Sequence, residues 1–230
     1  MDDATAVVTG ASRGIGASVA RQFAAEGARV VVCARDGDAV EAVAEGIRTD
    51  GGTARAVRAD VRDEFDVERL VEVAAREGGG IDVVVANAGV YHGDPGATPL
   101  DEESYSAFDD HVRTNGRGVF ATIREAAPHL ADGARVLVPS GPIAREADPG
   151  FGSYAVSKAL AEAVARQFAA ALRAPVGVVD PGRVATDLAG DAGRDPDEIA
   201  PMFCWAATDA PAEDLDGGVL TLRDWKAATR

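Results

Sequence analysis

Tyr154 and Lys158 are the pair of side chains in this sequence best suited to moving a proton. They stand four residues apart in an alanine-rich segment, so on a helix they share one face. A tyrosine hydroxyl, with a pKa of about 10, exchanges its proton slowly near neutral pH, whereas a nearby ammonium favours the phenolate and lowers that pKa. A plain surface contact between helical turns would give the same spacing, so the pair needs support from the rest of the chain.

A glycine-rich turn stands near the N-terminus, between a predicted strand and a predicted helix. Residues Gly10–Gly16 read Gly-Ala-Ser-Arg-Gly-Ile-Gly. Glycines at such a place allow a tight turn and let the backbone approach a pyrophosphate, which is then held at the positive end of the helix. An ordinary turn between strand and helix is the alternative. Because both flanking elements are present as the mechanism requires, we predict a dinucleotide site.

Two arginines beside this turn bear on the choice of dinucleotide. A site for NAD usually carries an acidic residue after the second strand to hold the ribose hydroxyls, whereas a phosphate there needs cations. Ala34 occupies the acidic position, Arg35 follows it, and Arg13 lies inside the glycine turn. A guanidinium binds phosphate through paired hydrogen bonds, so these residues predict NADP(H). The alternatives are a salt bridge between Arg35 and the adjacent Asp36, or two solvated surface arginines.

Short β-branched runs alternate with longer alanine-rich segments along the chain. Most runs are continuously apolar, which is typical of strands covered on both faces in a parallel sheet. We therefore predict an α/β fold, a Rossmann-type doubly wound parallel sheet of about seven strands with helices on both faces, in a single domain over residues 1–230. The predicted strands are Ala4–Thr9, Arg29–Ala34, Ala54–Ala59, Asp82–Ala86, Arg135–Pro139, Val176–Asp180 and Val219–Leu222. The predicted helices are Ile15–Glu26, Asp38–Thr49, Glu64–Glu77, Glu102–Leu130, Gly152–Leu172 and a shorter one near Glu198–Thr208.

The bulk composition excludes several classes of protein. A chain of 230 residues with 47% hydrophobic and 27% charged residues suits one globular domain. No apolar run approaches the roughly 20 residues that span a bilayer, and the acidic N-terminus lacks the basic region of a signal peptide. The net charge of −15 repels polyphosphates. We expect a cytoplasmic protein that has no nucleic-acid or membrane partner.

The basic residues are unusual in type, because 21 of the 23 are arginine and only Lys158 and Lys226 are lysine. An acidic surface almost without lysine resembles that of halophilic proteins, since screening by salt shortens the range of self-repulsion. A GC-rich genome is the alternative, although it would not by itself explain the acidity. We predict adaptation to high salt.

The cysteines and histidines are too scattered to suggest a metal site. Cys33 and Cys204 lie far apart, and each is predicted to be a structural thiol. The three histidines, His92, His111 and His129, are likewise separated. We predict that no metal is bound.

These motifs follow one another in a pattern that resembles the classical short-chain dehydrogenase/reductase family. The glycine turn is similar to that family's TGxxxGxG, and Tyr154 with Lys158 reproduces its YxxxK. Further matches are Asn87-Ala88-Gly89 after the fourth strand, Asn115 in the next helix, Ser140 after the fifth strand, and Pro181-Gly182 with Thr186 after the sixth. The matches cover nearly the whole chain.

The resemblance implies an NADP(H)-dependent oxidoreductase that moves hydride between the nicotinamide and a carbonyl or secondary alcohol carbon. Tyr154 would be the general acid/base and Lys158 would assist it. Ser140 would hydrogen-bond the substrate oxygen, and Asn115 would hold a water that links Lys158 to solvent. The implied cofactor-binding residues are Gly10, Ser12, Arg13, Gly14, Ile15, Gly16, Arg35, Asp60, Val61, Asn87, Ala88, Gly89, Tyr154, Lys158, Pro181, Gly182, Val184 and Thr186.

Each of these residues also has a simpler interpretation when it is taken alone. Ser140 would then be a turn serine, Asn115 a helix-interior side chain that bonds the backbone, and Thr186 a loop cap. Two other functions stay open for the whole chain, namely an NAD-linked alcohol dehydrogenase and a non-catalytic dinucleotide-binding sensor or scaffold.

Three segments depart from the family pattern. Ser140 precedes Tyr154 by fourteen residues, one more than in many members, so Gly141–Gly152 is expected to differ locally. Asp187–Pro196 is short and polar, which predicts a small lid and an open pocket. The terminal strand is followed only by Arg223–Arg230. The substrate itself is not predicted, but candidate pocket walls are, by position, Tyr91, His92, Ile143, Phe151 and Met202.

A homo-oligomer is also implied by the resemblance. Family tetramers pack through the long helices that here contain Asn115 and Tyr154, and through the terminal strand. Because that strand and its following segment are abbreviated in this chain, a dimer and a tetramer both stay open.

Overall fold

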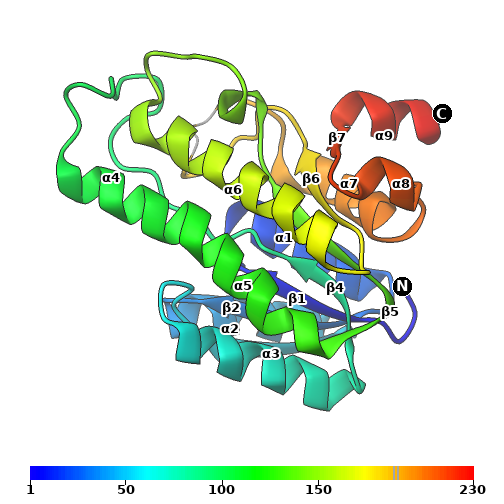
Figure 1. Ribbon diagram of the computed structural model, residues 1–230. Coiled ribbons are helices and arrows are strands. Elements are labelled where there is room, and N and C mark those ends of the chain that lie inside the picture. Colours follow the sequence, from blue (N-terminus) through cyan, green and yellow to red (C-terminus); the bar gives the residue numbers. More distant parts are fainter. Residues whose placement is uncertain (189, 191) are drawn as a thin grey trace.

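Seven parallel strands form the centre of the computed structural model, which describes residues 1–188, 190 and 192–230 (Figure 1). Their order across the sheet is β3-β2-β1-β4-β5-β6-β7. The strands are β1 (Thr5–Thr9), β2 (Arg29–Ala34), β3 (Thr53–Arg58), β4 (Ile81–Val85), β5 (Leu130–Pro139), β6 (Val176–Asp180) and β7 (Val219–Thr221). The predicted fold class, a doubly wound parallel sheet in one Rossmann-like domain, is confirmed.

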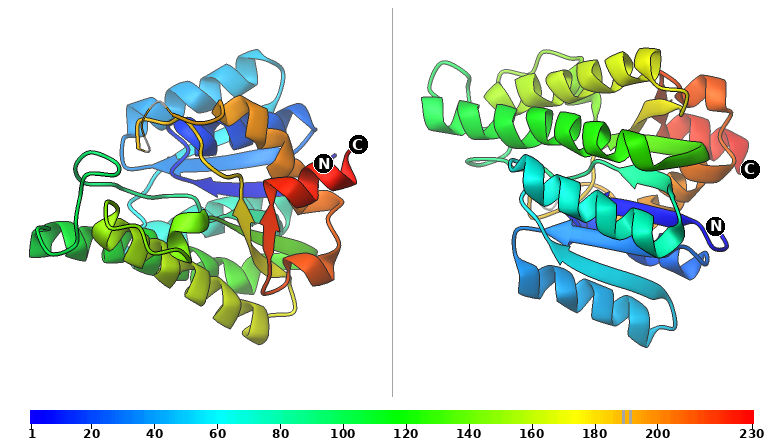
Figure 2. Two further views of the ribbon diagram at one scale, coloured as in Figure 1. Left: turned by 90° about the horizontal axis from the view of Figure 1, so that it is seen from above. Right: turned by 60° about the horizontal axis from the view of Figure 1, so that its bottom comes forward.

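Helices cover both faces of this sheet (Figure 2). The α-helices are α1 (Gly14–Ala25), α2 (Gly37–Thr49), α3 (Glu64–Gly78), α4 (Tyr105–His111), α5 (Gly118–Ala126), α6 (Gly152–Ala171), α7 (Pro196–Thr208), α8 (Ala212–Leu215) and α9 (Leu222–Ala228). The shorter elements are the π-helix η1 (Val112–Arg117) and the 3-10 helices η2 (Ala127–His129) and η3 (Pro142–Ala144).

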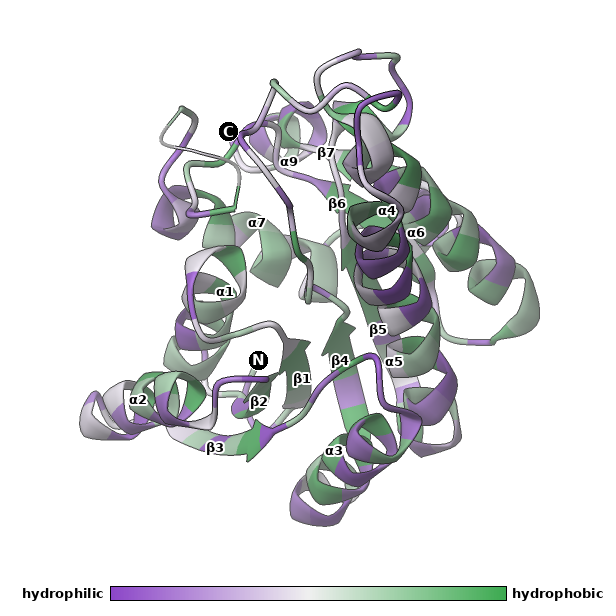
Figure 3. Cartoon of the chain, turned by 90° about the vertical axis from the view of Figure 1, so that its left-hand side faces the viewer, coloured by the Kyte–Doolittle hydropathy of each residue, from purple (hydrophilic) through white to green (hydrophobic). Residues whose placement is uncertain are grey.

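The sheet separates two apolar cores. On one face α1, α2 and α7 bury Phe23, Ile47 and Phe203 against the strands. On the other face, the corresponding layer of α3, α5 and α6 buries side chains such as Leu70 and Ile123. Figure 3 shows the strands as largely hydrophobic, with hydrophilic residues concentrated on the outward sides of the helices. Burial on both faces explains why the strand sequences are continuous apolar runs.

The chain reverses its direction of progress across the sheet at β1 and β4. β1 pairs with β2 on one side and with β4 on the other, and Val8 of β1 stands beside Val85 of β4. The segments that leave these two strands therefore start side by side and diverge. In open parallel sheets this arrangement creates a crevice outside the carboxyl ends of the strands, where ligands bind.

The long helix predicted over Glu102–Leu130 is wrong in its extent. It begins at Tyr105, where the Ser104 hydroxyl accepts a hydrogen bond from the Ala107 N–H and caps the helix. It then widens into η1, resumes as α5 and ends in η2. π-helical turns inside α-helices are frequent at functional sites, and this one contains Asn115.

Only the start of β5 differs from the prediction by more than one residue, and the end of β7 differs by one residue for a visible reason. β5 begins at Leu130 rather than Arg135, across an irregularity in its pairing with β4; Asp and Gly at 132 and 133 are poor strand formers and hide this start in the sequence. β7 ends at Thr221 rather than Leu222, because Thr221 and Asp224 form a capping box that starts α9. The remaining strand ends agree within one residue.

Candidate functional site

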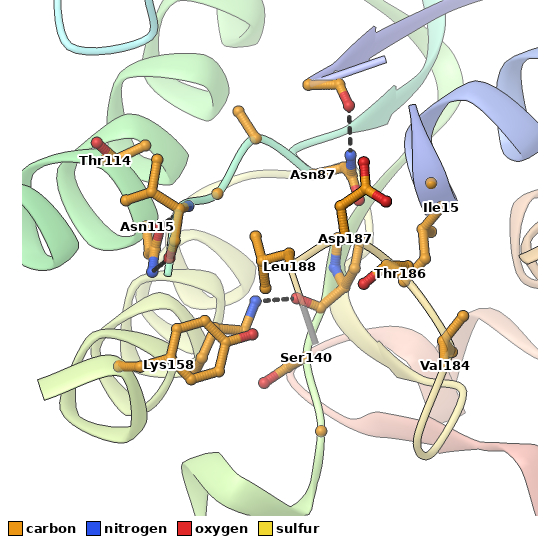
Figure 4. Close-up of a pocket in the computed structure, with 18 of the residues that line it drawn as sticks. Ile15, Asn87, Thr114, Asn115, Ser140, Lys158, Val184, Thr186, Asp187 and Leu188 are labelled. Carbon is orange, nitrogen blue, oxygen red and sulfur yellow. Dashed lines mark hydrogen bonds between the residues drawn. The ribbon is translucent and has the colours of Figure 1, made fainter. Parts of the chain in front are cut away.

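A cavity of about 860 Å³, called the cleft below, lies at the carboxyl ends of β1, β2, β4, β5 and β6. Of the residues predicted to bind cofactor or do chemistry, all but Gly16 line it. In Figure 4, Ile15, Val184 and Thr186 lie on one side of the cleft, and Asn115 and Lys158 lie on the other. The structure therefore brings together motifs that are distributed over most of the chain.

Three of the five predicted pocket walls are wrong. Ile143 and Phe151 line the cleft, whereas Met202 lies on the core-facing side of α7 and is fully buried. Tyr91 packs against the ring of Tyr154 at 4.8 Å between ring centroids, and His92 turns outwards to Asp110. Several other residues that line the cleft had no motif to reveal them, among them Thr114, Pro142, Glu146, Asp148 and Leu188.

The glycine turn and Asn87-Ala88 form one interlocked unit at the phosphate end of the cleft. The Thr9 hydroxyl accepts hydrogen bonds from the backbone N–H groups of Asn87 and Ala88, both at 3.0 Å. The Asn87 side chain donates to the carbonyls of Thr9 at 2.9 Å and Gly10 at 3.1 Å. Thr9 was not among the predicted site residues, although a hydroxyl at the end of the first strand was visible in the sequence.

Close packing explains two of the glycines. A Cβ on Gly10 would lie 2.6 Å from the Ala88 Cα, and Gly10 also has a φ of +65°. A Cβ on Gly16 would lie 2.5 Å from the Asn87 amide nitrogen. Gly16 thus serves the packing of α1 against this unit and does not line the cleft, and its predicted contact with the cofactor stays a prediction.

Arginines surround the part of the cleft next to β2. Arg35 is exposed and lines the cleft, and its carbonyl accepts a hydrogen bond from Arg58 Nε at 3.2 Å. Asp36 instead caps α2, where its side chain accepts from the Ala39 N–H at 3.0 Å, and no ion pair joins it to Arg35 in the described part of the chain. Arg13 makes an exposed ion pair with Asp187, 3.4 Å between Nη1 and Oδ2. Arg58, which the sequence did not single out, adds a third cation here.

Asp60 and Val61 follow β3, as predicted. Arg62 binds the Asp60 carboxylate through Nε and Nη2, and this hydrogen bonding lowers the pKa of Asp60. Arg62 also donates to Asp110, whose other oxygen contacts His92. Val61 packs against the start of α5, where Gly118 has no room for a side chain. Asp60 is thus fixed by an arginine that sequence reasoning missed.

Ser140, Tyr154 and Lys158 come together at the opposite end of the cleft. Lys158 Nζ donates a hydrogen bond to the Pro139 carbonyl at 2.7 Å (Figure 4). The Ser140 Oγ is buried and, within the described residues, has no hydrogen-bond partner. A buried hydroxyl without a partner is costly unless something else satisfies it, so this oxygen is free to bind a ligand in the cleft.

Burial sets the protonation of Tyr154 and Lys158. It raises the pKa of Tyr154 to about 12, with a smaller contribution from the charge of Tyr91. It lowers the pKa of Lys158 to about 8, against the opposing effect of the Glu162 carboxylate. The structure thus gives a raised pKa for Tyr154 where the sequence predicts a lowered one, because the phenol loses its contact with solvent. Near neutral pH both groups are protonated.

Asn115 uses its amide to join three segments. Its Nδ2 donates to the Val90 carbonyl at 3.0 Å and to the Ser157 hydroxyl at 2.9 Å, while its Oδ1 accepts from the Val90 N–H at 2.8 Å. These contacts fix η1 against α6 and the segment after β4. The predicted water bound by Asn115 stays a prediction.

The start of α6, which carries Tyr154 and Lys158, is capped from a distant part of the chain. The helix has no side-chain cap of its own, and Glu103 Oε2 accepts the Ser153 N–H at 2.6 Å. The Glu103 side chain is only 8% exposed, so this carboxylate stabilises the positive end of α6 from within the protein. Gly152 leaves the required space, because a Cβ there would lie 2.6 Å from the same oxygen. Glu103 lies fifty residues earlier in the sequence and no spacing rule could have found it.

The segment after β6 folds back on itself beside the glycine turn. Gly182 N–H donates to Asp180 Oδ1 at 2.9 Å, and Val184 and Thr186 form bridges with Arg194 and Gly190. The Thr186 methyl would lie 3.3 Å from a Cβ on Gly14. The predicted lid, Asp187–Pro196, includes residues 189 and 191, which lie outside the described residues.

The two cysteines lie in surroundings typical of structural thiols. Cys33 is fully buried, Cys204 is half-buried, and burial raises the pKa of each thiol to about 12. Among residues 1–188, 190 and 192–230, no group of three His, Cys, Asp or Glu could hold a metal ion. No helix within those ranges is long and apolar enough to cross a membrane.

Comparisons with known proteins place the chain in a family. The family model for short chain dehydrogenases matches residues 4–197. An uncharacterized oxidoreductase of Methylorubrum extorquens is 34% identical over 232 residues, covering 91% of this chain and 92% of the relative. Glycine betaine reductase of Emericella nidulans is 38% identical over 190 residues, which cover 80% of this chain but 15% of that much longer protein.

A solved structure extends the likeness to three dimensions. A short chain dehydrogenase from Burkholderia cenocepacia, in complex with NADP, superimposes with a TM-score of 0.85, at 30% sequence identity and with 96% of each chain covered. The protein belongs to the short-chain dehydrogenase/reductase family and is an oxidoreductase of that family.

The Glu103 cap leads to a test of how α6 is held. Glu103→Ala removes the acceptor for the Ser153 N–H, so we expect the free energy of unfolding to fall by about 1–2 kcal/mol in urea titrations. Glu103→Gln keeps an oxygen in place and should lose less than half as much. Equal losses for the two variants would show that the hydrogen bond to α6 does not stabilise the protein.

Proposed function

We propose that the protein is an NADP(H)-dependent oxidoreductase that transfers hydride between the nicotinamide and a carbonyl or secondary alcohol carbon, with Tyr154 as general acid/base. The proposal depends on the arrangement of side chains along the cleft. The buried Ser140 hydroxyl, Tyr154 and Lys158 converge at one end of a cleft whose other end is built from the glycine turn and arginines. A dinucleotide lying along the cleft would extend from the arginines to these three side chains.

The residues at the phosphate end fit NADP(H). Gly10 and Gly14 have φ values of +65° and +55°, and their missing side chains leave the start of α1 open to a pyrophosphate. Arg35 and Arg13 would bind the 2′-phosphate of the adenosine ribose, with Arg58 next to them. The solved relative from Burkholderia cenocepacia binds NADP, which supports the same cofactor here.

The residues at the other end fit proton transfer to a carbonyl oxygen. The bound cofactor supplies the hydride for reduction, or accepts it in the reverse reaction. Ser140 would donate a hydrogen bond to the substrate oxygen and stabilise the charge that develops there. Tyr154 would give its proton to that oxygen, and the Lys158 ammonium would stabilise the phenolate that results. Because burial holds the pKa of Tyr154 at about 12, the phenol is protonated at neutral pH, as a proton donor to the substrate oxygen must be.

Tyr154→Phe tests the chemical role. The variant keeps the aromatic ring but has no proton to give, so we expect kcat for carbonyl reduction to fall by about 10²–10⁴-fold. NADPH affinity, measured by fluorescence titration, should change less than about threefold because the cofactor's phosphates would be bound by the start of α1 and the arginines. The assay uses a panel of ketones and aldehydes in low and high salt. Undiminished turnover, or loss of cofactor binding together with activity, would contradict the role of Tyr154.

Arg35→Asp tests the choice of cofactor. The substitution removes a charge-assisted pair worth about 1.5–3 kcal/mol and adds a repulsive carboxylate, so the ratio of kcat/KM for NADPH to that for NADH should fall by at least about tenfold. Arg76→Asp on α3 is the matched control, since Arg76 is exposed and its side chain pairs with Glu72. An unchanged ratio in the Arg35 variant would favour the NAD-linked alternative.

We also propose that the protein forms a homo-oligomer through α5 and α6. Phe120, Val156 and Leu160 are 44%, 40% and 37% exposed on these helices, although apolar side chains of this size are usually buried. Light scattering after gel filtration should give a dimer or tetramer for the wild type and a smaller species for Leu160→Arg. Phe65→Arg on α3, where Phe65 is 73% exposed, should keep the wild-type mass. A monomeric wild type would contradict the proposal.

A further inference from the structure

One arginine and two buried carboxylates form an ion cluster next to the proton-transfer residues. Arg145 Nη1 donates to Glu162 Oε1 at 3.0 Å, and Arg145 Nη2 donates to Asp180 Oδ2. The side chains of Glu162 and Asp180 are 3% and 7% exposed, whereas that of Arg145 is 35% exposed. Carboxylates this deeply buried require a cation, and Arg145 supplies it to both. These three residues are called the Arg145 cluster below.

Each member of the Arg145 cluster comes from a different segment of the site. Arg145 follows η3, in the segment between Ser140 and Tyr154 that is one residue longer than the family pattern predicts. Glu162 lies on α6, four residues after Lys158 and therefore on the same face. Asp180 ends β6, and its second oxygen accepts the N–H of Gly182 in the turn that lines the cleft. One guanidinium thus joins three segments.

The Lys158 ammonium interacts with a backbone carbonyl and with a carboxylate. Its Nζ donates to the Pro139 carbonyl at 2.7 Å, next to Ser140, while the Glu162 carboxylate opposes the lowering of its pKa by burial. As long as Arg145 pairs with Glu162, the guanidinium compensates part of the charge of that carboxylate. Without Arg145, an unpaired carboxylate would remain in surroundings of low dielectric and would attract the ammonium more strongly.

We propose that Arg145 is a positioning residue, which pairs with Glu162 and Asp180 and so keeps the Lys158 ammonium directed to the cleft beside Ser140. The same contacts hold the Gly182 turn against the segment that follows Ser140. The inference rests on the proposed function, in which Lys158 assists Tyr154. It assigns a role to a side chain that does not itself touch the reacting atoms.

The charges around Lys158 balance only when Arg145 is present. The titratable groups are Tyr154 and Glu162 on α6, Arg145 after η3, Asp180 at the end of β6, and Tyr91 against the Tyr154 ring. With both tyrosines neutral, two cations face two carboxylates. Removing Arg145 leaves one carboxylate in excess, and Lys158 is a cation on which Glu162 already acts.

The chain offers a direct probe of this effect because it contains only two lysines, Lys158 and Lys226. Protein labelled with ¹³C at lysine Cε should give two signals, and Lys226, exposed on α9, serves as the internal reference. In the wild type we expect Lys158 to titrate near pH 8. In Arg145→Met its midpoint should rise by about one pH unit or more, while Lys226 is unchanged.

Two further variants separate electrostatics from damage to the fold. Arg145→Met with Glu162→Gln should restore the wild-type titration of Lys158, because the excess carboxylate is gone. Glu162→Gln alone should move the Lys158 midpoint below the wild-type value, since the anion that raises it is removed. Arg166→Met, an exposed arginine on the same helix, should leave the titration unchanged. If Arg145→Met does not fold, Glu162→Gln and Arg145→Gln still decide the question, because both keep only two lysines in the chain and Arg145→Gln should give the same rise.

The kinetic consequence is a shift of the pH profile. The alkaline limb of kcat/KM reports ionisation in the free enzyme, so it should move upward in Arg145→Met together with Lys158, and kcat at pH 7 should fall at least about tenfold. A folded Arg145→Met protein with an unmoved Lys158 titration would overturn the inference. The titration needs no turnover, so a wild type without NADPH-dependent activity would contradict the proposed function and leave the role of Arg145 to be judged by the titration.

Discussion

The junction between the ends of β1 and β4 is the contact on which the rest of the site depends. Thr9 and Asn87 exchange backbone and side-chain hydrogen bonds there, and Gly10 approaches Ala88 so closely that a Cβ would collide with its backbone. Because the chain adds strands in opposite directions from β1 and from β4, the junction fixes the two walls of the cleft relative to each other. Gly89 connects Ala88 to Val90, whose N–H donates to Asn115. Asn115 in turn donates to Ser157 on α6, so the junction is linked to that helix.

Burial is the second constraint, and it acts on protonation. Tyr154 and Lys158 both lose solvent, which raises the pKa of the phenol and lowers that of the ammonium. The buried carboxylates near them have partners. Arg145 donates to Glu162 and Asp180, and the N–H of Ser153 at the start of α6 donates to Glu103. Burial thus sets the protonation of the two groups, while contacts outside the cleft hold α6 and the segment after Ser140 in place around them.

Much of the fold was predictable because a parallel sheet buried on both faces leaves apolar runs that are easily read. The local motifs were predictable for a similar reason: the glycine turn and the Tyr154–Lys158 pair function through neighbours in sequence. Glu103, Arg145 and Arg62 were not, because each acts on a partner brought near by the topology. Met202 was misassigned since an apolar residue after the Pro-Gly turn fits a core as well as a pocket. The break in the long helix at η1 coincides with the hydrogen bond from Asn115 to Val90, a tertiary contact that no helix propensity contains.

A crystal structure of the protein with NADPH bound would show whether the cleft is the cofactor site. We expect the adenosine 2′-phosphate against Arg35, the pyrophosphate at the start of α1, and the nicotinamide ring beside Tyr154, Lys158 and Ser140. A nucleotide bound outside the cleft, or one whose nicotinamide lies away from Tyr154 and Ser140, would contradict this expectation.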